Sequence, residues 1–124
     1  MTRPDPYCYP ARVVRVIDGD TLDVRLDLGF GIARETRVRL LGINCPEVHG
    51  ASKTAGLAAK AFVEAVCKPG DELLVQSRAL QPASDAFGRA LAFVWVGEAD
   101  RTLNDLLIQK GFAVAYLHEL MERK

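Results

Sequence analysis

Three charged side chains, Arg39, Glu47 and Arg89, are the residues of this chain best suited to cutting a phosphodiester bond. Two guanidiniums can bind a phosphate and neutralise the charge that develops on its oxygens during in-line attack. A carboxylate can accept a proton from the attacking water. The nearby segment DGD at residues 18–20 offers oxygen ligands of the kind that hard divalent cations prefer. Together these residue types indicate phosphodiester hydrolysis.

Each of these residues also has an ordinary structural interpretation. Asp-Gly is a frequent hairpin turn, and Arg39 can be a solvated strand arginine beside Arg34 and Arg37. Glu47 can be a surface glutamate, and the stem of Arg89 can cover apolar surface. Taken singly, none of the four decides between the two interpretations. Their joint order along the chain favours the catalytic one.

Composition points to one globular domain without a long-range electrostatic pull on nucleic acid. The 124 residues carry 16 basic and 16 acidic side chains, so the formal net charge is zero. Any grip on nucleic acid must therefore be local. Residues 1–10 hold three prolines and are expected to form an extended arm, followed by a single domain at 11–124.

The cysteines and the hydropathy pattern indicate in which cellular compartment the protein is expected. Cys8, Cys45 and Cys67 are odd in number and lack metal-ligand spacing, which indicates free thiols in a reducing environment. No apolar run approaches the ~18 residues of a membrane span, and the first ten residues do not form a secretion signal. We expect a cytoplasmic monomer that does not contact membrane, with secretion after removal of a leader left open.

Runs rich in β-branched residues predict the strands. The first two, Arg12–Asp18 and Thr21–Asp27, are separated by a Gly-Asp turn that is typical of a hairpin. In the second run, apolar residues alternate with charged ones, which is the pattern of a half-buried strand. Three further strands are expected, at Arg34–Leu41, Glu72–Arg78 and Arg89–Val96.

Helices are predicted after the third and fifth strands. The first, Ser52–Cys67, has an apolar stripe formed by Leu57, Ala58, Ala61, Phe62, Ala65 and Val66. The second begins at Thr102, with Asp105 completing a cap and Gly111 ending the helix, and Tyr116–Lys124 is expected to add a short third helix. Three strands, a helix, two strands and a helix is the order of a five-stranded OB-fold barrel, an α+β and mainly β class with two to three helices. A plain α+β sheet is the alternative.

Three motifs in order carry a family resemblance: DGDT, then RLLGINCPE, then DAFGR before a strand. From about Ala11 to Tyr116 the chain resembles the staphylococcal nuclease (thermonuclease) family, the SNase-like domain. The resemblance implies an OB-barrel enzyme with three helices that hydrolyses DNA and RNA with calcium. It also implies products that end in a 3′-phosphate and a 5′-hydroxyl.

The resemblance assigns roles to particular positions. Arg39 and Arg89 look like phosphate-binding arginines, and Glu47 looks like the general base for water. Asp20 is similar to the first carboxylate ligand of calcium, and Cys45 stands where a backbone carbonyl completes the metal shell. The residues that line the family's nucleotide pocket correspond, by this resemblance, to Phe87, Leu91 and Tyr116 of this chain.

The chain departs from the family pattern at the metal. The family's second metal carboxylate is an aspartate, and this chain has Asn44 instead. An amide oxygen can ligate calcium but carries no formal charge, so we predict a weakened site for Ca²⁺ or another divalent cation. Ala86 and Phe87 replace a lysine and a tyrosine that typically flank the terminal phosphate, which predicts weaker substrate binding.

The sequence therefore predicts a metal-dependent nuclease that acts on DNA, preferably single-stranded, and on RNA, by in-line attack of water. The alternative is a non-catalytic OB-fold module that binds nucleic acid or a protein and has a degenerate metal site. The neutral net charge and Asn44 favour that alternative. A third hypothesis is a metal-independent relic of the fold whose arginines only bind phosphate.

Overall fold

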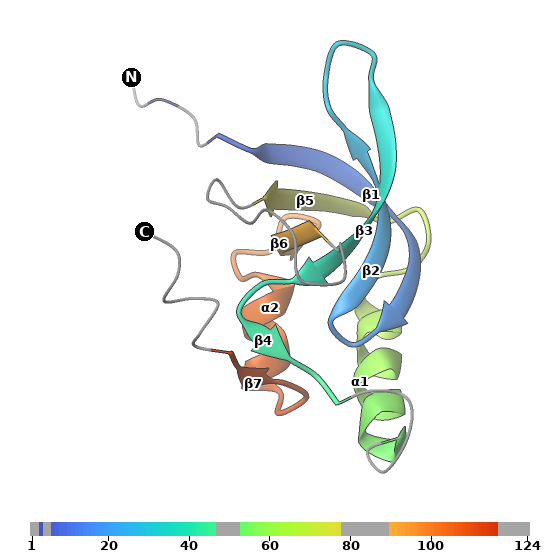
Figure 1. The fold of residues 1–124 in the computed structure, drawn as a ribbon, viewed down its shortest axis with the longest axis vertical. Coiled ribbons are helices and arrows are strands. Elements are labelled where there is room, and N and C mark those ends of the chain that lie inside the picture. Colours follow the sequence, from blue (N-terminus) through green and yellow to red (C-terminus); the bar gives the residue numbers. More distant parts are fainter. Residues whose placement is uncertain (1–2, 4–5, 47–52, 78–89, 117–124) are drawn as a thin grey trace.

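The computed structural model describes residues 3, 6–46, 53–77 and 90–116, and its centre is a closed five-stranded barrel (Figure 1). The barrel strands are β1 (Cys8–Asp18), β2 (Thr21–Asp27), β3 (Ala33–Leu40), β5 (Glu72–Ser77) and β6 (Ala90–Val96). They close in the order β1-β2-β3-β6-β5, with β3 and β6 parallel and the other neighbours antiparallel. This barrel, with two helices in the described part of the chain, confirms the predicted α+β, mainly β fold class.

The hairpin of β2 and β3 fixes the register of the barrel. β2 has the bounds that its alternating pattern predicted, and it pairs along its whole length with β3, from Thr21↔Arg39 to Asp27↔Ala33. Leu22 and Val24 are fully buried inside the barrel. Because side chains alternate across a strand, the register that buries these residues also sets which β3 residues face the core.

β1 is longer than its sequence pattern predicted. The strand begins at Cys8, so residues assigned to an extended arm belong to the barrel. Pro10 is the Cα partner of Leu74 on β5, while Ala11 is paired with both Leu73 and Leu26. β1 therefore joins the two edges of the sheet and closes the barrel.

Two helices cover the barrel in the described part of the chain. α1 (Lys53–Val66) packs against β1, and α2 (Leu103–Gln109) packs against β6. The Thr102 side chain accepts a hydrogen bond from the Asp105 amide at 3.0 Å, which confirms the predicted cap. Gly111, with a φ of 81°, follows the C-cap residue Lys110 in the left-handed conformation that glycine favours. Neither helix is long and apolar enough to cross a bilayer.

The predicted apolar stripe of α1 is right only in part, because Phe62 and Val66 pack against the core and its other four members are exposed. The buried residues of this helix are Gly56, Ala59 and Val63, whereas Leu57, a member of the predicted stripe, is 46% exposed. The physical reason is close packing, since small residues let the helix axis approach the turn between β1 and β2. The hydrophobic pattern gave no weight to Gly56, so the predicted stripe lies to one side of the face that the helix buries.

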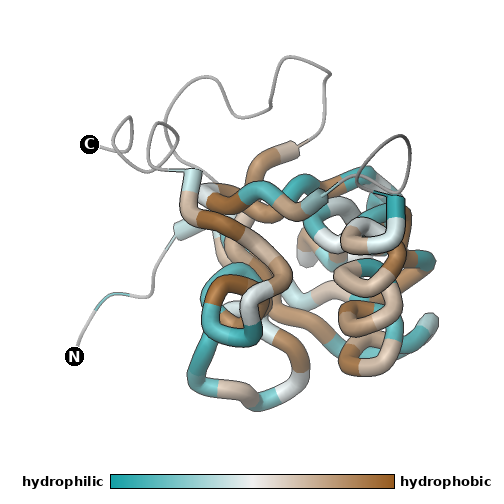
Figure 2. The backbone as a smooth tube through the Cα atoms, turned by 90° about the horizontal axis from the view of Figure 1, so that it is seen from below, coloured by the Kyte–Doolittle hydropathy of each residue, from teal (hydrophilic) through white to brown (hydrophobic). Residues whose placement is uncertain are grey.

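The core fills the barrel and continues beneath both helices. Figure 2 shows hydrophobic and hydrophilic residues alternating along the strands and helices. The largest fully buried aliphatic side chains are Leu22, Leu40, Leu41, Ile43, Leu103 and Leu107. Four of these six come from β2, from the end of β3 and from the residues just after it, so the end of β3 is a rigid part of the fold.

Asn104 is a buried polar residue that holds α2 to the strands. Its Nδ2 donates to the carbonyls of Leu41 at 2.8 Å and Ala92 at 3.1 Å, and its Oδ1 accepts from the Val94 amide at 3.1 Å. Both ends of the amide are thus satisfied in a low-dielectric interior. This connection fixes the chain where it leaves β3.

A second, two-stranded sheet that the sequence did not indicate lies outside the barrel. β4 (Ile43–Asn44) pairs with β7 (Val114–Ala115), with Ile43 opposite Ala115 and Asn44 opposite Val114. Figure 1 shows both strands beside α2. Two-residue strands carry no periodic signal, which is why the sequence pattern misses them.

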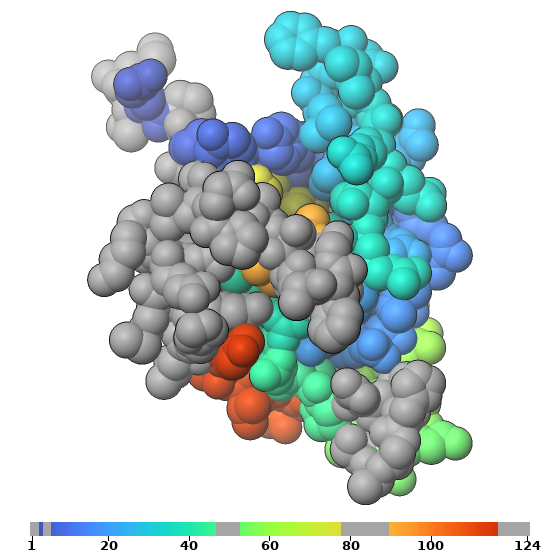
Figure 3. All heavy atoms as spheres, in the orientation of Figure 1, coloured from blue at the N-terminus to red at the C-terminus, as the bar shows by residue number. Residues whose placement is uncertain are grey.

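The loop between β2 and β3 stands out from the body of the molecule (Figure 3). Phe30 at its tip is fully exposed and has a φ of 57°, between two glycines that also have positive φ. The Leu28 amide donates to the Ile32 carbonyl at 2.9 Å, and the Ile32 amide donates to the Gly29 carbonyl at 2.9 Å. The tip is therefore a closed hairpin loop that displays an aromatic ring.

A charged network braces the outer face of β1, β2 and β3. The carboxylate of Asp23 is buried between Arg37, whose Nε donates to it at 2.8 Å, and Arg15, whose Nε lies 3.0 Å from it. The hydrogen bond from Arg37 is the main reason that the pKa of Asp23 lies below its usual value; burial opposes it, and the charges of both arginines add to it. The network therefore stabilises the folded state only while Asp23 is ionised.

We expect the contribution of Asp23 to stability to disappear in acid. As pH falls, the unfolded chain takes up the Asp23 proton first, at about pH 4, because the folded-state pKa is the lower of the two. Asp23→Asn should therefore lower the free energy of unfolding at about pH 7, and its deficit should shrink as the pH approaches about 3. Urea titrations at both pH values measure this, with the exposed Asp100→Asn as the control. A deficit that stays constant with pH would contradict the assigned role of the charge.

Candidate active site

The turn between β1 and β2 is packed too closely for any residue but glycine at position 19. A Cβ atom on Gly19 would lie 2.8 Å from the Cβ of Ala59 and 3.0 Å from the Sγ of Cys45. Contacts this short are repulsive in a close-packed interior. Gly19 therefore allows the turn to sit against α1 and the residue after β4, which places Asp20 beside them.

Asp20 is anchored on three sides. The residue is 9% exposed, its Oδ2 accepts a hydrogen bond from the Cys45 amide at 3.0 Å, and its Oδ1 accepts from the Thr21 hydroxyl at 3.2 Å. Its main-chain carbonyl accepts from the Leu40 amide at 2.8 Å. The carboxylate is thus held at the end of β3, next to the chain that follows β4.

Arg39 is the buried cation of this region. It is 6% exposed, and its Cα partners are Thr21 on β2 and Leu91 on β6. Its Nη2 donates to the Ile43 carbonyl at 2.8 Å and also donates to the Oδ1 of Asn44. Arginine is rarely buried unless its donors have partners. The sequence interpretation of Arg39 as a solvated strand residue is therefore wrong.

The small sheet of β4 and β7 places Tyr116 beside Arg39. The Tyr116 amide donates to the Gly42 carbonyl at 2.7 Å, directly after the pairing of β4 with β7. The guanidinium carbon of Arg39 lies 5.9 Å from the centroid of the Tyr116 ring, which is within the range of a cation–π interaction. Tyr116 is 37% exposed, so its ring borders both the arginine and solvent.

The described residues thus bring together six of the nine candidates taken from the sequence: Asp20, Arg39, Asn44, Cys45, Leu91 and Tyr116. Leu91 is 3% exposed and contributes to the wall behind Arg39. The other three candidates, Glu47, Phe87 and Arg89, lie outside the described residues. Glu47 is bonded to Pro46, and Arg89 is bonded to Ala90, the Cα partner of Val38.

The thiol of Cys45 is unsuited to acid–base or metal chemistry. Burial, together with the charges of Asp20 and Asp18 and against that of Arg39, raises its pKa to about 12. A thiol ligates metals and attacks electrophiles only as the thiolate, so this side chain is inert at neutral pH. The role that the resemblance assigns to Cys45 falls on its main-chain carbonyl, which does not depend on the state of the thiol.

The fit of this region to a divalent cation is limited. No group of three or more His, Cys, Asp or Glu side chains that could hold a metal forms among residues 3, 6–46, 53–77 and 90–116. Both oxygens of Asp20 already accept a hydrogen bond, and the oxygen of Asn44 accepts one from Arg39. Calcium takes six to eight oxygens, with carboxylates among them. Among the described residues, a cation at this place would have to share the oxygens of Asp20 and Asn44 with these hydrogen bonds.

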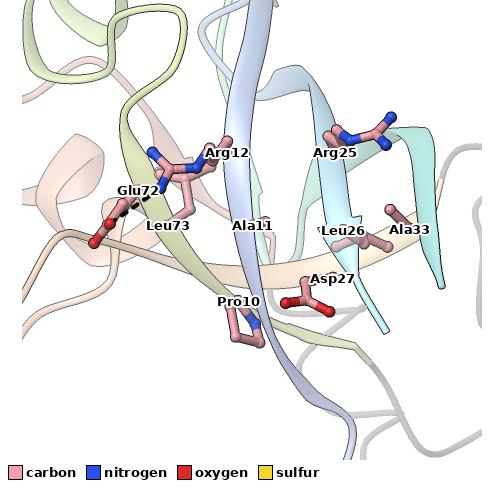
Figure 4. Close-up of a pocket in the computed structure, with 9 residues that line it drawn as sticks. All are labelled: Pro10, Ala11, Arg12, Arg25, Leu26, Asp27, Ala33, Glu72 and Leu73. Atoms are coloured by element: carbon pink, nitrogen blue, oxygen red, sulfur yellow. Dashed lines mark hydrogen bonds and ion pairs between the residues drawn. The ribbon is translucent and has the colours of Figure 1, made fainter. Parts of the chain in front are cut away.

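The described surface has hollows both beside the site and away from it. One, of about 240 Å³, adjoins the site and is lined by Asn44, Cys45, Pro46, Gly111, Phe112, Ala113 and Val114. The other, of about 410 Å³, lies where β1, β2 and β5 meet, and Figure 4 shows Arg12 paired with Glu72 at one of its sides. This larger hollow contains none of the candidate residues, and its charges come from Arg12, Arg25, Asp27 and Glu72. The candidate catalytic and metal-binding residues therefore lie away from the larger hollow.

Two contributors to the site were missed by sequence reasoning. Thr21 is 1% exposed and donates to Asp20, and the carbonyl of Ile43 accepts from Arg39. Thr21 could have been found, because a hydroxyl directly after an acidic turn commonly bonds the neighbouring carboxylate. A main-chain carbonyl gives no sequence signal.

Comparison with known proteins places the chain in the family of staphylococcal nuclease homologues. A sequence model described as staphylococcal nuclease homologue matches residues 37–124. A thermonuclease of Staphylococcus intermedius is 33% identical over 103 residues, which cover 83% of this chain and 57% of that protein. The protein ParB of Escherichia coli is 33% identical over 114 residues, covering 84% of this chain and 55% of that protein. The uncharacterized protein MJ1439 of Methanocaldococcus jannaschii is 27% identical over 130 residues, covering 88% and 60%. The chain thus spans little more than half the length of these relatives.

Proposed function

Because the chain belongs to the family of staphylococcal nuclease homologues, we propose that it is a nuclease that hydrolyses the phosphodiester bonds of single-stranded DNA and of RNA. The observation that carries the proposal is Arg39, a buried guanidinium that donates hydrogen bonds to the Ile43 carbonyl and to the Asn44 side-chain oxygen. Burial of such a charge is costly, and a fixed donor in a water-poor site is what binding of a phosphate requires.

In the proposed mechanism, Arg39 and Arg89 bind the non-bridging oxygens of the scissile phosphate. Glu47 takes a proton from the water that attacks phosphorus in line with the leaving 5′-oxygen. The bond from phosphorus to the 5′-oxygen breaks and that oxygen takes up a proton, so the products are a 3′-phosphate and a 5′-hydroxyl. Two chain connections support this convergence. Glu47 is bonded to Pro46, which follows Cys45, a residue whose thiol pKa is lowered by the charge of Arg39. Arg89 is bonded to Ala90, which precedes Leu91, the Cα partner of Arg39 on β6.

Substrate contacts are proposed for three residues at the same place. Leu91 and Tyr116 border Arg39, and Phe87 lies three residues before the start of β6. An aromatic ring provides a face on which any base can stack, which suits a substrate without sequence preference. A flexible single strand can follow such a curved surface more easily than a stiff duplex.

A divalent cation, calcium in the first instance, is proposed to bind weakly at Asp20 and the main-chain carbonyl of Cys45. When bound there it would offset negative charge on the scissile phosphate. Asp20 would hold it through one carboxylate, whose position is fixed by Cys45 and Thr21. The Asn44 oxygen, predicted from the resemblance as a further ligand, accepts a hydrogen bond from Arg39.

The second candidate function is a non-catalytic module that binds nucleic acid. The observation in its favour is Asn44, because a neutral amide in place of a carboxylate weakens a metal-dependent reaction. Such a module would bind single strands with a marked dependence on salt and would release no products.

Cleavage of labelled single-stranded DNA separates the two functions. We expect the protein to shorten the strand in calcium at millimolar concentration, far more slowly in a chelator, and to leave 3′-phosphate ends. End analysis with a phosphatase that acts on 3′-phosphates checks the product. Binding without shortening, in calcium, magnesium and manganese alike, would establish the binding module instead.

A further inference from the structure

Asn44 has one side-chain oxygen, and two roles compete for it. In the structure the oxygen accepts a hydrogen bond from Nη2 of Arg39. A guanidinium has donors and no acceptor, so the amide must turn its oxygen toward Arg39 and leave Nδ2 as its other polar end. A donor suits a phosphate oxygen and repels a cation. A metal ion on this oxygen would lie beside the positively charged guanidinium, so the observed orientation disfavours a metal at Asn44.

The contact is part of a clamp on the guanidinium. The same Nη2 donates to the Ile43 carbonyl at 2.8 Å, and pairing of β4 with β7 fixes both clamp residues, with Asn44 opposite Val114. An arginine side chain that is free to rotate loses much entropy when it binds a ligand. Because the clamp removes that freedom in advance, Arg39 is held ready for phosphate.

The neutral charge of Asn44 adds to this effect. An aspartate at this position would form an ion pair with Arg39 and would repel a phosphate, whereas an amide orients the guanidinium without cancelling its charge. A divalent cation bound to the same oxygen would lie close to the guanidinium, and the two positive charges would repel each other. One residue therefore cannot serve both groups well.

We propose that Asn44 is a positioning residue that holds Arg39 for phosphate and lies outside the metal shell. The inference rests on the proposed function only in that Arg39 binds phosphate. It makes phosphate binding at Arg39 largely independent of metal, and it leaves the cation to Asp20 and the main chain.

Binding in the absence of metal tests the coupling between the two residues. The probe is a fluorescein-labelled oligothymidylate of about 16 nucleotides, titrated in a chelator and followed by anisotropy. We expect Asn44→Ala and Arg39→Lys each to weaken binding about tenfold, and the double variant to bind no more weakly than Arg39→Lys alone. Ile32→Ala, which changes an exposed residue in the loop between β2 and β3, should leave binding unchanged. Fully multiplicative effects of the two variants would overturn the proposal.

Calcium binding without nucleic acid supplies the second arm. Isothermal titration should give the same calcium affinity for the parent chain and Asn44→Ala. Asn44→Asp should bind calcium more tightly, because it adds a carboxylate, and should bind the oligonucleotide in chelator more weakly, because it pairs with Arg39. An Asn44→Ala variant that loses calcium affinity but keeps metal-free binding would show that Asn44 is a ligand after all.

The proposal stays testable if the parent chain binds the oligonucleotide too weakly to measure. The guanidinium protons of Arg39 should then exchange slowly with water in NMR spectra of the parent chain and rapidly in Asn44→Ala, and equal exchange rates would overturn the clamp. Absence of cleavage in every metal would sink the proposed nuclease and leave these binding and exchange results standing.

Discussion

Replacing Glu47 with glutamine is expected to lower the rate of single-strand cleavage by about 10²–10⁴-fold, the usual contribution of a general base. Glutamine keeps the size and the hydrogen-bonding reach of the side chain but cannot accept a proton. Because ground-state contacts to the phosphate come from the arginines, the affinity for an oligonucleotide in chelator should change little. The loss should therefore appear in kcat and not in KM.

The Glu47 variant is measured by single-turnover cleavage of a labelled strand in saturating calcium. Glu64, exposed on α1, offers a matched control, and Glu64→Gln should cleave at the parent rate. Activity of Glu47→Gln equal to that of the control would remove Glu47 from the mechanism and would direct the search to Asp20 and the cation.

Replacing Arg39 with lysine is expected to lower kcat/KM by about 10²–10³-fold, the loss typical of removing one transition-state donor. Lysine keeps the positive charge, but its donors all leave one nitrogen and cannot reproduce the planar fork, in which Nη2 bonds the Ile43 carbonyl and the Asn44 oxygen. The planar fork of the guanidinium is what permits all of these contacts. Charge alone should therefore fail to rescue activity.

The control for Arg39→Lys lies on the same strand. Arg34 is exposed near the start of β3, and Arg34→Lys should retain full activity. Because Arg39 is buried, urea unfolding of each variant must accompany the kinetics, so that lost activity is assigned to the folded protein. A folded Arg39→Lys enzyme with parent activity would contradict phosphate binding by the fork.

The bounds of a strand could be predicted from the sequence where the strand's own hydrophobic pattern determines them. The alternation in Thr21–Asp27 gave β2 its observed bounds, since each apolar residue faces the barrel and Gly19-Asp20 forms the turn before it. The start of β1 was missed because Pro10 argues locally against a strand. Its place in the barrel depends on pairing with Leu74, more than sixty residues away. Tertiary contacts, and not local propensity, decided that segment.

The site shows the same division. Motif order identified Asp20 and Arg39 as candidates, and the family resemblance added Tyr116. In the structure Tyr116 lies over Arg39, whose Cα partner on β2 is Thr21, the residue after Asp20. The sequence could not foresee that the oxygen of Asn44 turns toward Arg39. That contact depends on β4 pairing with β7, and a two-residue strand leaves no periodic trace. Side-chain orientation in such a segment follows from packing alone.

A crystal structure with calcium and thymidine 3′,5′-bisphosphate tests the central claim most directly. The account predicts one phosphate within hydrogen-bonding distance of both Arg39 and Arg89, with the carboxylate of Glu47 on the face opposite the leaving oxygen. It also predicts the Asn44 oxygen on Arg39 and any cation on Asp20. A nucleotide bound elsewhere, with Arg39, Arg89 and Glu47 opening onto separate surfaces, would contradict hydrolysis at this site.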